Sequence, residues 1–372
     1  MARPGNGVEV AIIGGGIVGA SAAYFLAERG ARPLLLESGL VGGEASGVNA
    51  GGVRQQGRLL PEMPLALESL ALWADLEKRL EARVEYERCG DMRVVETPAD
   101  AARLREVVAR EEAAGLRLEW VEGAALRSLV PAIAPQVLAG TFCPTGGQAN
   151  PLVVAAAFAR RARALGATVW ERCPVRSVTR DGHGFALDTL RGPARADRVI
   201  LSAGTWTPGL AQGLGARLPV SLSALQMVAT LPLPRVLGTV LLGVSRRLSL
   251  KQTRSGALLI GGGKQGRGDL ATREKRPSVE NIRLSAVDAA AVVPAAARAE
   301  AARSWVGLEG FTPDEMPIVG RLPEVEAYVA AGFSGHGFAI GPVVGRLLGE
   351  WLVDGRPSLD LSAFRADRFK TA

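Results

Sequence analysis

The stretch Gly14-Gly15-Gly16-Ile17-Val18-Gly19 decides the fold of this chain of 372 residues. It lies between an apolar run at 8–13, which is typical of a buried parallel strand, and residues 17–29, whose pattern predicts a helix. A second apolar run at 33–36 ends in Glu37, at about the twenty-residue spacing of a dinucleotide-binding fingerprint. The stretch therefore predicts a Rossmann-like α/β unit that binds a dinucleotide.

Each glycine of this fingerprint has its own physical role. Gly14 permits a tight turn, Gly16 lets a pyrophosphate approach the backbone, and Gly19 lets the helix pack closely on the strand. Free N–H groups and the positive dipole end at the start of the helix favour phosphate groups. Glu37 is expected to accept hydrogen bonds from a ribose. The alternative is an ordinary glycine-rich turn, and the order of strand, helix and second strand counts against it.

The composition is that of an ordinary globular protein, with 48% hydrophobic and 22% charged residues. No apolar run approaches the length of a transmembrane helix, and residues 1–5 leave no room for a signal peptide before the first strand, so a cytoplasmic protein is expected. Cys89, Cys143 and Cys173 form no C-x-x-C pair. No metal site is predicted from them, and we expect buried small hydrophobes.

The net charge of +7 raises the question of nucleic-acid binding. The densest basic stretch, residues 246–276, has no interleaved aromatic residues and no nucleic-acid fold signature. We therefore expect no nucleic-acid partner, and we interpret this stretch as a solvated face or a surface for docking a partner.

The order of elements predicts one domain interrupted by another. Helices are expected at 65–80, 100–114, 150–163, 279–292 and 341–353, and strands at 92–95, 167–170, 175–178, 185–187, 195–204, 220–230, 248–252, 258–260 and 328–332. The predicted nucleotide domain consists of residues 1–85, 150–215 and 311–372. The predicted substrate domain is an antiparallel α+β unit inserted twice, at 86–149 and 216–310.

The cofactor is predicted to be FAD rather than NAD. The chain follows Glu37 with a loop of small residues, 42–57, which suits a backbone lying against an extended ligand. Two later apolar strands run into Gly204 and Gly332. Both features fit a long ligand that crosses the carboxyl edge of the sheet.

Motifs spread over nearly the whole chain resemble those of one known superfamily. They are Asn49–Gln56, Gly147–Pro151, Ala203–Trp206, Phe311–Gly320 and Gly332–Phe338, together with the opening fingerprint. The chain resembles the FAD-dependent amino-acid oxidases, which include D-amino-acid oxidase, glycine oxidase and sarcosine oxidase. Within them it is most similar to the β (catalytic) subunits of heteromeric sarcosine, proline, hydroxyproline and opine dehydrogenases.

The resemblance implies contacts along the whole cofactor. Those at the diphosphate and adenosine are Gly14, Gly15, Gly16, Ile17, Val18, Gly19, Glu37, Ser38 and Val175. Those along the middle and beside the flavin are Ala45, Ser46, Asn49, Ala50, Gly51, Gly52, Ala203, Gly204 and Trp206. Those at the pyrimidine edge are Gly335, His336, Gly337, Phe338, Ala339 and Ile340. A helix that opens near Gly337 would stabilise the negative charge of a reduced flavin.

Arg54 is the main substrate candidate, because it aligns with the arginine that clamps the substrate carboxylate in sarcosine-oxidase-like members. Such a clamp would fix the Cα–H of the substrate over flavin N5. The alternative is that Arg54 only forms an ion pair at the surface. Gln55 and Gln56 are candidates for the same cavity. His336 is expected either to hydrogen-bond the substrate and tune the flavin or to pack as a structural histidine. His183 falls in a predicted hairpin turn and is expected to face solvent.

Three departures from the superfamily pattern narrow the prediction. Ala339 replaces the lysine of monomeric sarcosine oxidase, and Glu309 replaces the arginine that glycine oxidase carries in Gly-Leu-Arg-Pro. Residues 146–150 hold no counterpart of the histidine that tethers FMN in heterotetrameric sarcosine oxidase. The resemblance therefore implies noncovalent FAD, no FMN from this chain alone, and a pocket suited to a bulkier secondary amine.

The predicted activity is oxidation of the C–N bond of an amino acid or N-substituted amino acid, such as proline, hydroxyproline, sarcosine or an opine. Hydride passes to flavin N5 and the imine hydrolyses; no strong base is required if the amine binds neutral. As a dehydrogenase subunit, the chain would pass electrons to partner chains that carry further redox groups. The alternatives are a stand-alone oxidase that produces H₂O₂, a non-catalytic cofactor-binding subunit and an NAD-dependent dehydrogenase.

Overall fold

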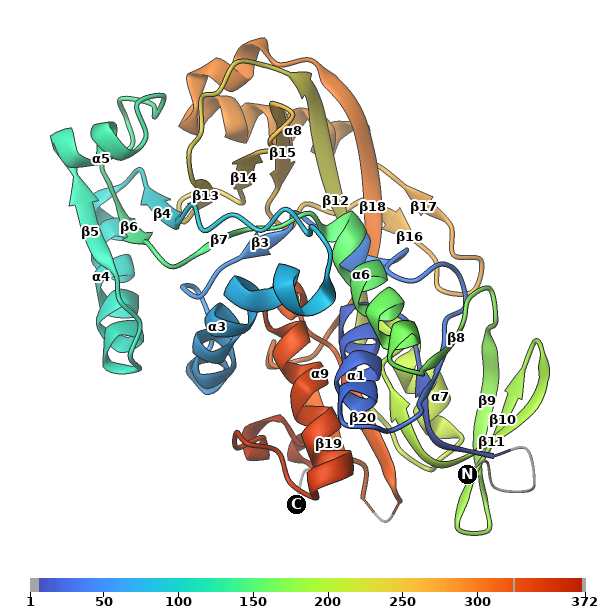
Figure 1. Ribbon diagram of the computed structural model, residues 1–372. Helices are drawn as coiled ribbons and strands as arrows, with labels where there is room; N and C mark the ends of the chain where they lie inside the picture. Colours follow the sequence, from blue (N-terminus) through green and yellow to red (C-terminus); the bar gives the residue numbers. More distant parts are fainter. Residues whose placement is uncertain (1–6, 324, 370–372) are drawn as a thin grey trace.

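The computed structural model describes residues 7–323 and 325–369, and it builds them into two large sheets (Figure 1). The expectation about a signal peptide concerned residues 1–5, which lie outside the described residues. Within the described part of the chain, no helix is both long and apolar enough to cross a membrane.

The first sheet has the order β19-β20-β11-β1-β2-β8, with β10 and β9 continuing from β11 as a hairpin. Its strands are β1 (Gly7–Ile13), β2 (Leu34–Leu36), β8 (Thr168–Trp170), β9 (Val175–Asp181), β10 (Gly184–Thr189), β11 (Gly192–Leu201), β19 (Ile318–Arg321) and β20 (Ala327–Ala331). The pairs β20–β11, β11–β1, β1–β2 and β2–β8 are parallel. The parallel sheet built from three separated segments is thus as predicted.

Strand β1 is buried on both faces, as its unbroken apolar sequence requires. Val10 and Ile12 pack with the helices on one side, whereas Ala11 and Ile13 pack with the β9–β10 hairpin on the other. Because side chains alternate along a strand, β1 joins two separate cores. This burial fixes the end of β1, which leads directly into the fingerprint turn.

Helices cover the first of these faces (Figure 1). They are α1 (Ile17–Glu28), α3 (Met63–Leu80), α6 (Pro151–Ala164) and α9 (Gly337–Asp354). Helices α1 and α9 approach so closely that a Cβ added at Gly345 would lie 2.1 Å from Ser21 Oγ. The short helix α7 (Thr207–Gln212) contributes to the second core, on the other face. At the start of α1 the contact with α9 is equally close, since a Cβ added at Gly341 would lie 2.7 Å from Ile17 Cγ2.

The second sheet has the order β18-β12-β15-β14-β13-β4-β6-β5. Its strands are β4 (Asp91–Val95), β5 (Glu119–Glu122), β6 (Ala139–Cys143), β12 (Ser221–Pro232), β13 (Val240–Gly243), β14 (Ser249–Gln252), β15 (Ala257–Gly261) and β18 (Ala301–Phe311). Its pairs are antiparallel, as expected for the substrate region, except that β13 runs parallel to β4. Helix α8 (Val279–Val292) covers one face through Ala289 and Val292.

Smaller elements connect the two sheets and complete the chain. The helices are α2 (Ala45–Val48), α4 (Pro98–Ala113) and α5 (Gly123–Leu129), and the short strands are β3 (Gly52–Val53), β7 (Gly147–Gln148), β16 (Arg267–Gly268) and β17 (Lys275–Arg276). The 3-10 helices are η1 (Leu60–Glu62), η2 (Gly204–Trp206), η3 (Pro294–Arg298), η4 (Ser362–Phe364) and η5 (Ala366–Phe369). Strands β3 and β7 pair with each other and bring two of the superfamily motifs side by side.

The start of the last helix and the exposure of His183 and of the cysteines were predicted from the sequence. The last helix begins at Gly337 rather than Gly341, because Pro342 is accommodated inside its second turn. His183 is exposed in the turn between β9 and β10, as predicted. Cys143 and Cys173 are buried as expected, whereas Cys89 is only half-buried.

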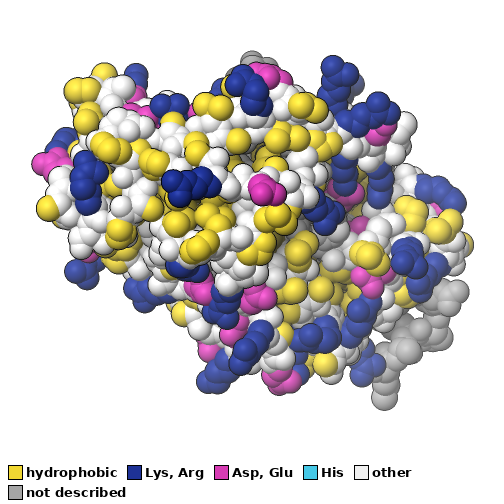
Figure 2. All heavy atoms as spheres, turned by 90° about the horizontal axis from the view of Figure 1, so that it is seen from above, with side chains coloured by type: hydrophobic (Ala, Val, Ile, Leu, Met, Phe, Trp, Pro, Cys, Tyr) yellow, Lys and Arg dark blue, Asp and Glu magenta, His cyan; other side chains and the backbone are white. Residues whose placement is uncertain are grey.

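The basic residues do not form one continuous patch on the face seen from above, where Lys and Arg lie among hydrophobic and acidic side chains (Figure 2). The expectation of a solvated face at 246–276 is wrong for Lys251, which is 4% exposed. Arg246 is half-buried, since it is paired with Glu96 at 2.6 Å. Lys251 is buried because it belongs to β14, which is an inner strand of the second sheet.

Candidate active site

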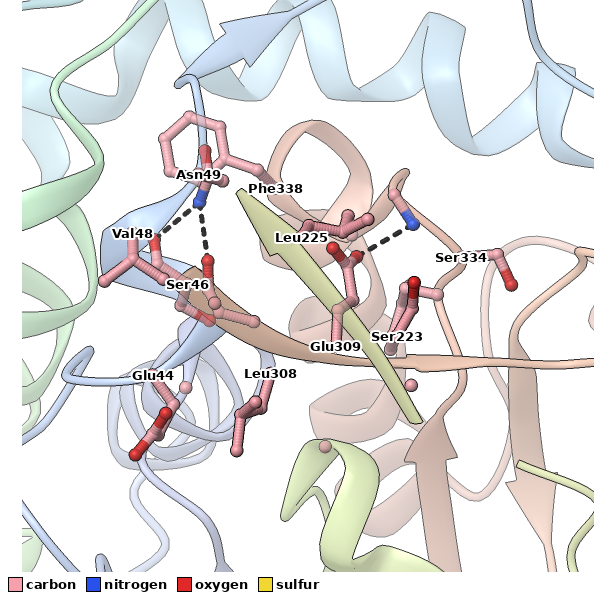
Figure 3. A pocket seen from close by; sticks show the side chains of 18 of the residues that line it. Glu44, Ser46, Val48, Asn49, Ser223, Leu225, Leu308, Glu309, Ser334 and Phe338 are labelled. Carbon is pink, nitrogen blue, oxygen red and sulfur yellow. Dashed lines mark hydrogen bonds between the residues drawn. The ribbon is translucent and has the colours of Figure 1, made fainter. Parts of the chain in front are cut away.

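A cavity of about 1240 Å³ runs between the two sheets. One end is lined by the turn after β1 and the end of β2, and the other by β12, β18 and the start of α9 (Figure 3). The wall thus contains the carboxyl ends of parallel strands, where open α/β sheets bind ligands. A single elongated ligand can contact both sheets.

The fingerprint glycines adopt the geometry that only glycine allows. Gly14 has a φ of 107°, and a Cβ there would lie 2.4 Å from the carbonyl oxygen of Ser202 on the strand-end segment after β11. A Cβ on Gly19 would lie 1.9 Å from the carbonyl oxygen of Gly14. The turn and the helix are therefore pressed together, which places the first N–H groups of α1 at the cavity.

The start of α1 is suited to a diphosphate. Gly16, Ile17 and Val18 line the cavity, and the first turn of α1 carries no acidic side chain. The N–H of Ile17 donates to Ser46 Oγ at 2.9 Å, so the hydroxyl of α2 is also at this point. Helix N–H groups, a small hydroxyl and a backbone without side chains form a site for phosphate oxygens.

Glu37 is fixed at the end of β2. Its carboxylate accepts the N–H of Gly15 at 2.7 Å, the N–H of Gly39 at 2.6 Å and the hydroxyl of Ser38 at 3.0 Å. Glu37, Ser38 and Val175 all line the cavity. A carboxylate held in this way can present its remaining acceptor positions to ribose hydroxyls.

The loop after α2 is ordered by Asn49. Its side-chain amide donates to the carbonyl oxygens of Ala45 at 2.9 Å and Ser46 at 2.8 Å, and its Oδ1 accepts the N–H of Gly51 at 2.6 Å. Trp305 on β18 donates its indole N–H to the carbonyl oxygen of Val48 at 2.7 Å. The loop is thus ordered internally and fastened to the second sheet, while its small residues line the cavity. Figure 3 shows Ser46, Val48 and Asn49 of this segment at the cavity.

Arg54 reaches the cavity from the segment after β3. Its Nη1 lies 3.2 Å from the position that a Cβ on Gly57 would take, and the guanidinium of Arg93 lies 3.8 Å from the same position. Burial lowers the pKa of Arg54, and Asp91, Glu62 and Glu111 act in the opposite direction. Among the described residues, no ion pair joins Arg54 to a carboxylate, so its charge is available for an anionic ligand.

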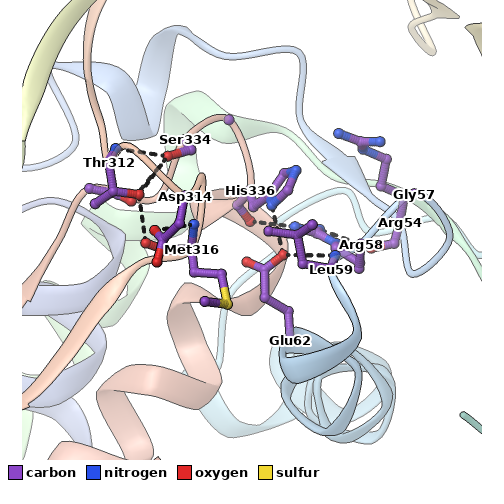
Figure 4. A network of polar contacts seen from close by, with 12 residues as sticks. Arg54, Gly57, Arg58, Leu59, Glu62, Thr312, Asp314, Met316, Ser334 and His336 are labelled. Carbon is purple, nitrogen blue, oxygen red and sulfur yellow. Dashed lines mark hydrogen bonds and ion pairs between the residues drawn. The ribbon is translucent and has the colours of Figure 1, made fainter. Parts of the chain in front are cut away.

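A buried polar cluster lies behind Arg54 (Figure 4). Glu62 is fully buried, and its carboxylate oxygen lies 2.8 Å from Nδ1 of His336. Arg58 donates to the carbonyl oxygens of His336 at 3.1 Å and Arg54 at 3.0 Å. Burial lowers the pKa of His336, although Glu62 opposes this shift. The cluster connects the Arg54 segment to the start of α9.

Glu309 on β18 faces the other part of the cavity (Figure 3). Its Oε1 accepts the N–H of Gly335 at 2.8 Å. Burial raises the pKa of Glu309 to about 7, and the bond from Gly335 only partly offsets this rise. A cavity-facing carboxyl group with a pKa near neutrality can bind a cation or exchange a proton.

The comparisons with known proteins agree with this geometry. A family model described as DAO, FAD dependent oxidoreductase, matches residues 9–351. The chain belongs to this family. The predicted cofactor, FAD, and the predicted class, an oxidoreductase of the amino-acid oxidase type, are thereby confirmed.

Three relatives illustrate the likeness. The chain is 32% identical to the 4-methylaminobutanoate oxidase (formaldehyde-forming) of Paenarthrobacter nicotinovorans, over 97% of this chain but only 46% of that protein. It is 30% identical to the glycine oxidase of Geobacillus kaustophilus over 97% of both chains, and a crystal structure of that glycine oxidase superposes with a TM-score of 0.92 over 99% of this chain and 100% of the other. It is 27% identical to the sarcosine oxidase subunit beta of an Arthrobacter species, over 99% of this chain and 93% of that subunit. The chain therefore spans about half of the first relative and nearly all of the other two.

Most of the residues predicted to contact the cofactor line one cavity. They are Gly14, Gly16, Ile17, Val18, Glu37, Ser38, Ala45, Ser46, Asn49, Ala50, Gly51, Gly52, Val175, Ala203, Gly204, Trp206, Gly335, Gly337 and Phe338. The structure thus brings together segments that lie far apart in the sequence.

The remaining predicted residues lie behind the cavity wall. Gly15 and Gly19 serve the turn, and the backbone of Ala339 accepts hydrogen bonds from Trp73 at 2.8 Å and from Ser69 at 3.1 Å. Ile340 is fully buried in the helix core. His336 faces Glu62 rather than the cavity.

Gln55 and Gln56 also lie outside the lining of the cavity. Gln56 donates to the carbonyl oxygens of Asp91 at 2.9 Å and Thr141 at 3.2 Å, which attaches its segment to β4 and β6. Gln55 accepts the hydroxyl of Thr145 at 3.1 Å. Both amides hold the segment that carries Arg54, and neither reaches the cavity in this structure.

From the sequence, Glu309 is recognisable only as a departure from a family motif, and Arg93 is not among the predicted site residues. Both line the cavity. A signal for Glu309 was present, since an acid in an otherwise apolar strand end is unusual. Arg93 gave no such signal, because its approach to Arg54 depends on the pairing of β4 with β6 and β13.

Proposed function

We propose that this enzyme oxidises the C–N bond of an amino acid or N-substituted amino acid, with secondary amines as the preferred class. The observation that carries the proposal is the guanidinium of Arg54, which faces the FAD-type cavity without a carboxylate partner among the described residues. The carboxylate of a substrate would form an ion pair with this guanidinium. A substrate that carries a carboxylate next to an oxidisable amine, as an amino acid does, therefore fits the cavity.

Each part of the wall has a distinct task in this reaction. FAD, when bound, supplies the hydride acceptor. Arg54 holds the carboxylate and thereby fixes the Cα–H of the substrate, which lowers the entropic part of the barrier. The start of α9 at Gly337 and Phe338 presents backbone N–H groups to the cavity, where they favour negative charge.

The relatives support the substrate class. 4-Methylaminobutanoate, glycine and sarcosine, which appear in their names, each carry an amine and a carboxylate. Two of the three are secondary amines. Proline, hydroxyproline, sarcosine and opines remain the proposed candidates for this chain, and FAD is proposed to bind without a covalent bond.

The proposed assembly is a heteromeric dehydrogenase in which this chain is the catalytic subunit. Support comes from the likeness to the subunit of a sarcosine oxidase. In this arrangement electrons leave for redox groups on partner chains. The second candidate is a stand-alone oxidase, which the likeness to glycine oxidase favours.

An anaerobic reduction screen tests the proposal. The FAD-loaded protein is mixed without oxygen with about twenty amino acids, N-methyl amino acids and opines, and the flavin absorbance is followed. We expect bleaching by at least one secondary amino acid. If none of the compounds bleaches the flavin, the result would support the alternative of a non-catalytic subunit.

The electron acceptor is tested on the substrate found in this screen. Stoichiometric peroxide in air would identify an oxidase. Slow reaction with oxygen together with fast reduction of an artificial electron acceptor would identify a dehydrogenase subunit.

A further inference from the structure

Glu309 differs from the other carboxylates of the cavity wall in its partners. Glu37 accepts bonds from Gly15, Ser38 and Gly39, and Glu44 forms an ion pair with Lys275. Glu309 accepts only the N–H of Gly335, at 2.8 Å. Among the described residues, it is the cavity carboxylate that lacks both a cation and a set of donors.

The surroundings of Glu309 offer no internal neutralisation. Figure 3 shows Ser223 and Leu225 of β12 beside it, and among the described residues no charged side chain contributes to the shift of its pKa. The described carboxylates that influence Arg54 are Asp91, Glu62 and Glu111, so Glu309 lies apart from the guanidinium. The cavity therefore presents a positive and a negative side chain at two separate points.

Separated opposite charges in one cavity match a zwitterion. A substrate amino acid has a carboxylate for Arg54 and an ammonium group for a carboxylate. Building on the proposed function, we propose that Glu309 binds the substrate nitrogen and accepts its proton before C–N oxidation. Glu309 is then a catalytic residue that the family arginine at this position cannot replace.

The proton and electron balance of this step is complete. The N–H bond of the ammonium breaks, its proton goes to a carboxylate oxygen of Glu309, and the nitrogen keeps the electron pair. The Cα–H bond then breaks with its electron pair, which passes as hydride to the FAD of the proposed function, while the nitrogen pair forms the C=N bond. Water adds to the resulting iminium ion to give the carbonyl compound and a protonated amine.

This assignment changes one expectation from the sequence. The sequence predicted that no strong base is required if the amine binds neutral, yet aliphatic amines are largely protonated at pH 7. A carboxyl group whose pKa is near neutrality matches a proton acceptor at that pH. Glu309 would thus let the enzyme use the abundant ammonium form.

The first test compares Glu309→Gln with the wild type in anaerobic flavin reduction from about pH 5.5 to about pH 10. The amide introduced by this substitution cannot take up the substrate proton, but its oxygen can still accept the N–H of Gly335, which preserves the local fold. We expect the rate at pH 7 to fall about a hundredfold in Glu309→Gln, with recovery at high pH where the free amine predominates. Glu309→Asp should keep a pH profile of the wild-type form.

The matched control is Glu300→Gln. Glu300 is exposed and lies one residue before β18, so the same chemical change is made outside the cavity. We expect the control to follow the wild-type profile. An unchanged rate and pH profile in Glu309→Gln would overturn the proposal.

A second test separates nitrogen binding from proton transfer. Glycine betaine carries a permanent cation and has no proton to lose, whereas acetate carries only the carboxylate. We expect Glu309→Gln to weaken betaine binding at least tenfold, measured by perturbation of the flavin spectrum, and to leave acetate binding unchanged. Equal effects on both ligands, or on neither, would overturn the assignment of Glu309 to the nitrogen.

Failure of this inference is distinguishable from failure of the proposed function. If no amino acid reduces the wild-type flavin, the proposed function fails. If the wild type is reduced and Glu309→Gln behaves like it, only the role of Glu309 fails.

Discussion

Arg54 holds its charge inside the protein among other charged residues that do not neutralise it directly. Its guanidinium lies near that of Arg93, and Arg93 is only 3.6 Å from Glu111. Among the described residues, Arg93 therefore has a carboxylate partner, whereas Arg54 forms no ion pair. Such an arrangement favours an anionic ligand at Arg54.

Replacing Arg54 by methionine should weaken carboxylate binding. A hydrogen bond to a charged group contributes about 1.5–3 kcal/mol, so we expect KM to rise at least tenfold, with a smaller change in kcat. Steady-state kinetics with the substrate found in the screen measures both values. Arg180→Met, at an exposed position on β9 outside the cavity lining, is the control. An unchanged KM in Arg54→Met would remove the clamp from the mechanism.

The buried ammonium group of Lys251 should make the stability of the protein depend on pH. Burial lowers its pKa from 10.5 to about 8, and its ammonium group donates to the carbonyl oxygen of Ala149 at 3.3 Å. Between these two values the unfolded chain holds more protons than the folded chain, so stability rises with pH there. Below pH 8 the ammonium group is charged in both states, so its burial lowers the free energy of unfolding by the full amount.

We expect Lys251→Met to be more stable than the wild type by about 3 kcal/mol below pH 8, with the difference shrinking as the pH rises toward 10.5. Urea unfolding at several pH values measures this difference. Lys78→Met on the exposed face of α3 should show none of it. A difference that is constant with pH would contradict the stated cause.

The location of a predicted site residue could be inferred from the sequence where one local motif determines it. Glu37 could be placed because its carboxylate follows β2 by one residue. His336, Gln55 and Gln56 were harder, because the sequence does not show whether a polar side chain points into the cavity or toward a buried partner. Glu62 decides this for His336, and it lies 274 residues away in the chain.

At the scale of elements, the join between β1 and α1 is the tightest contact of the cofactor site. A Cβ on Gly19 would meet the carbonyl oxygen of Gly14 at 1.9 Å, and neither backbone segment can move freely. Gly19→Ala should therefore destabilise the protein by about 3 kcal/mol and lower its FAD content. Thermal unfolding and the ratio of flavin to protein absorbance measure the two effects.

Gly238→Ala is the control for this change. Gly238 has open space at the Cβ position and no positive φ, so the added methyl group meets nothing. Both stability and FAD content should stay at wild-type values. Normal flavin loading in Gly19→Ala would show that the join tolerates a side chain.

Elements with a clear apolar pattern could be predicted from the sequence, whereas the short strands β5, β6 and β13 could not. The helix at 279–292 and the strands around 221–232 and 257–261 have clear apolar patterns. Strands β5, β6 and β13 have four or five residues each, and their pairing depends on segments far away in the chain. The parallel contact between β4 and β13 is of this kind.

The whole molecule should respond to its cofactor as one unit, because one cavity is lined by both sheets. FAD at a hundredfold excess over its Kd should add about 2.7 kcal/mol to the free energy of unfolding. Thermal unfolding of the apoprotein with increasing FAD measures this gain. FMN lacks the adenosine half and should raise Tm less, and equal effects of the two flavins would argue against the fingerprint site.

Acid precipitation tests how the flavin is held. We expect the yellow colour in the supernatant and a colourless protein pellet, since the proposed attachment is noncovalent. A yellow pellet that survives washing would reveal a covalent bond.

The order of strands in the first sheet has a consequence for biosynthesis. Strand β11 lies between β1 and β20, and β20 ends at Ala331, more than three hundred residues after β1. A ribosome must therefore translate the chain through Ala331 before this sheet can close and before the flavin pocket exists. Until then the nascent polypeptide exposes apolar strand edges, so chaperones and a slow, late folding step are to be expected during expression.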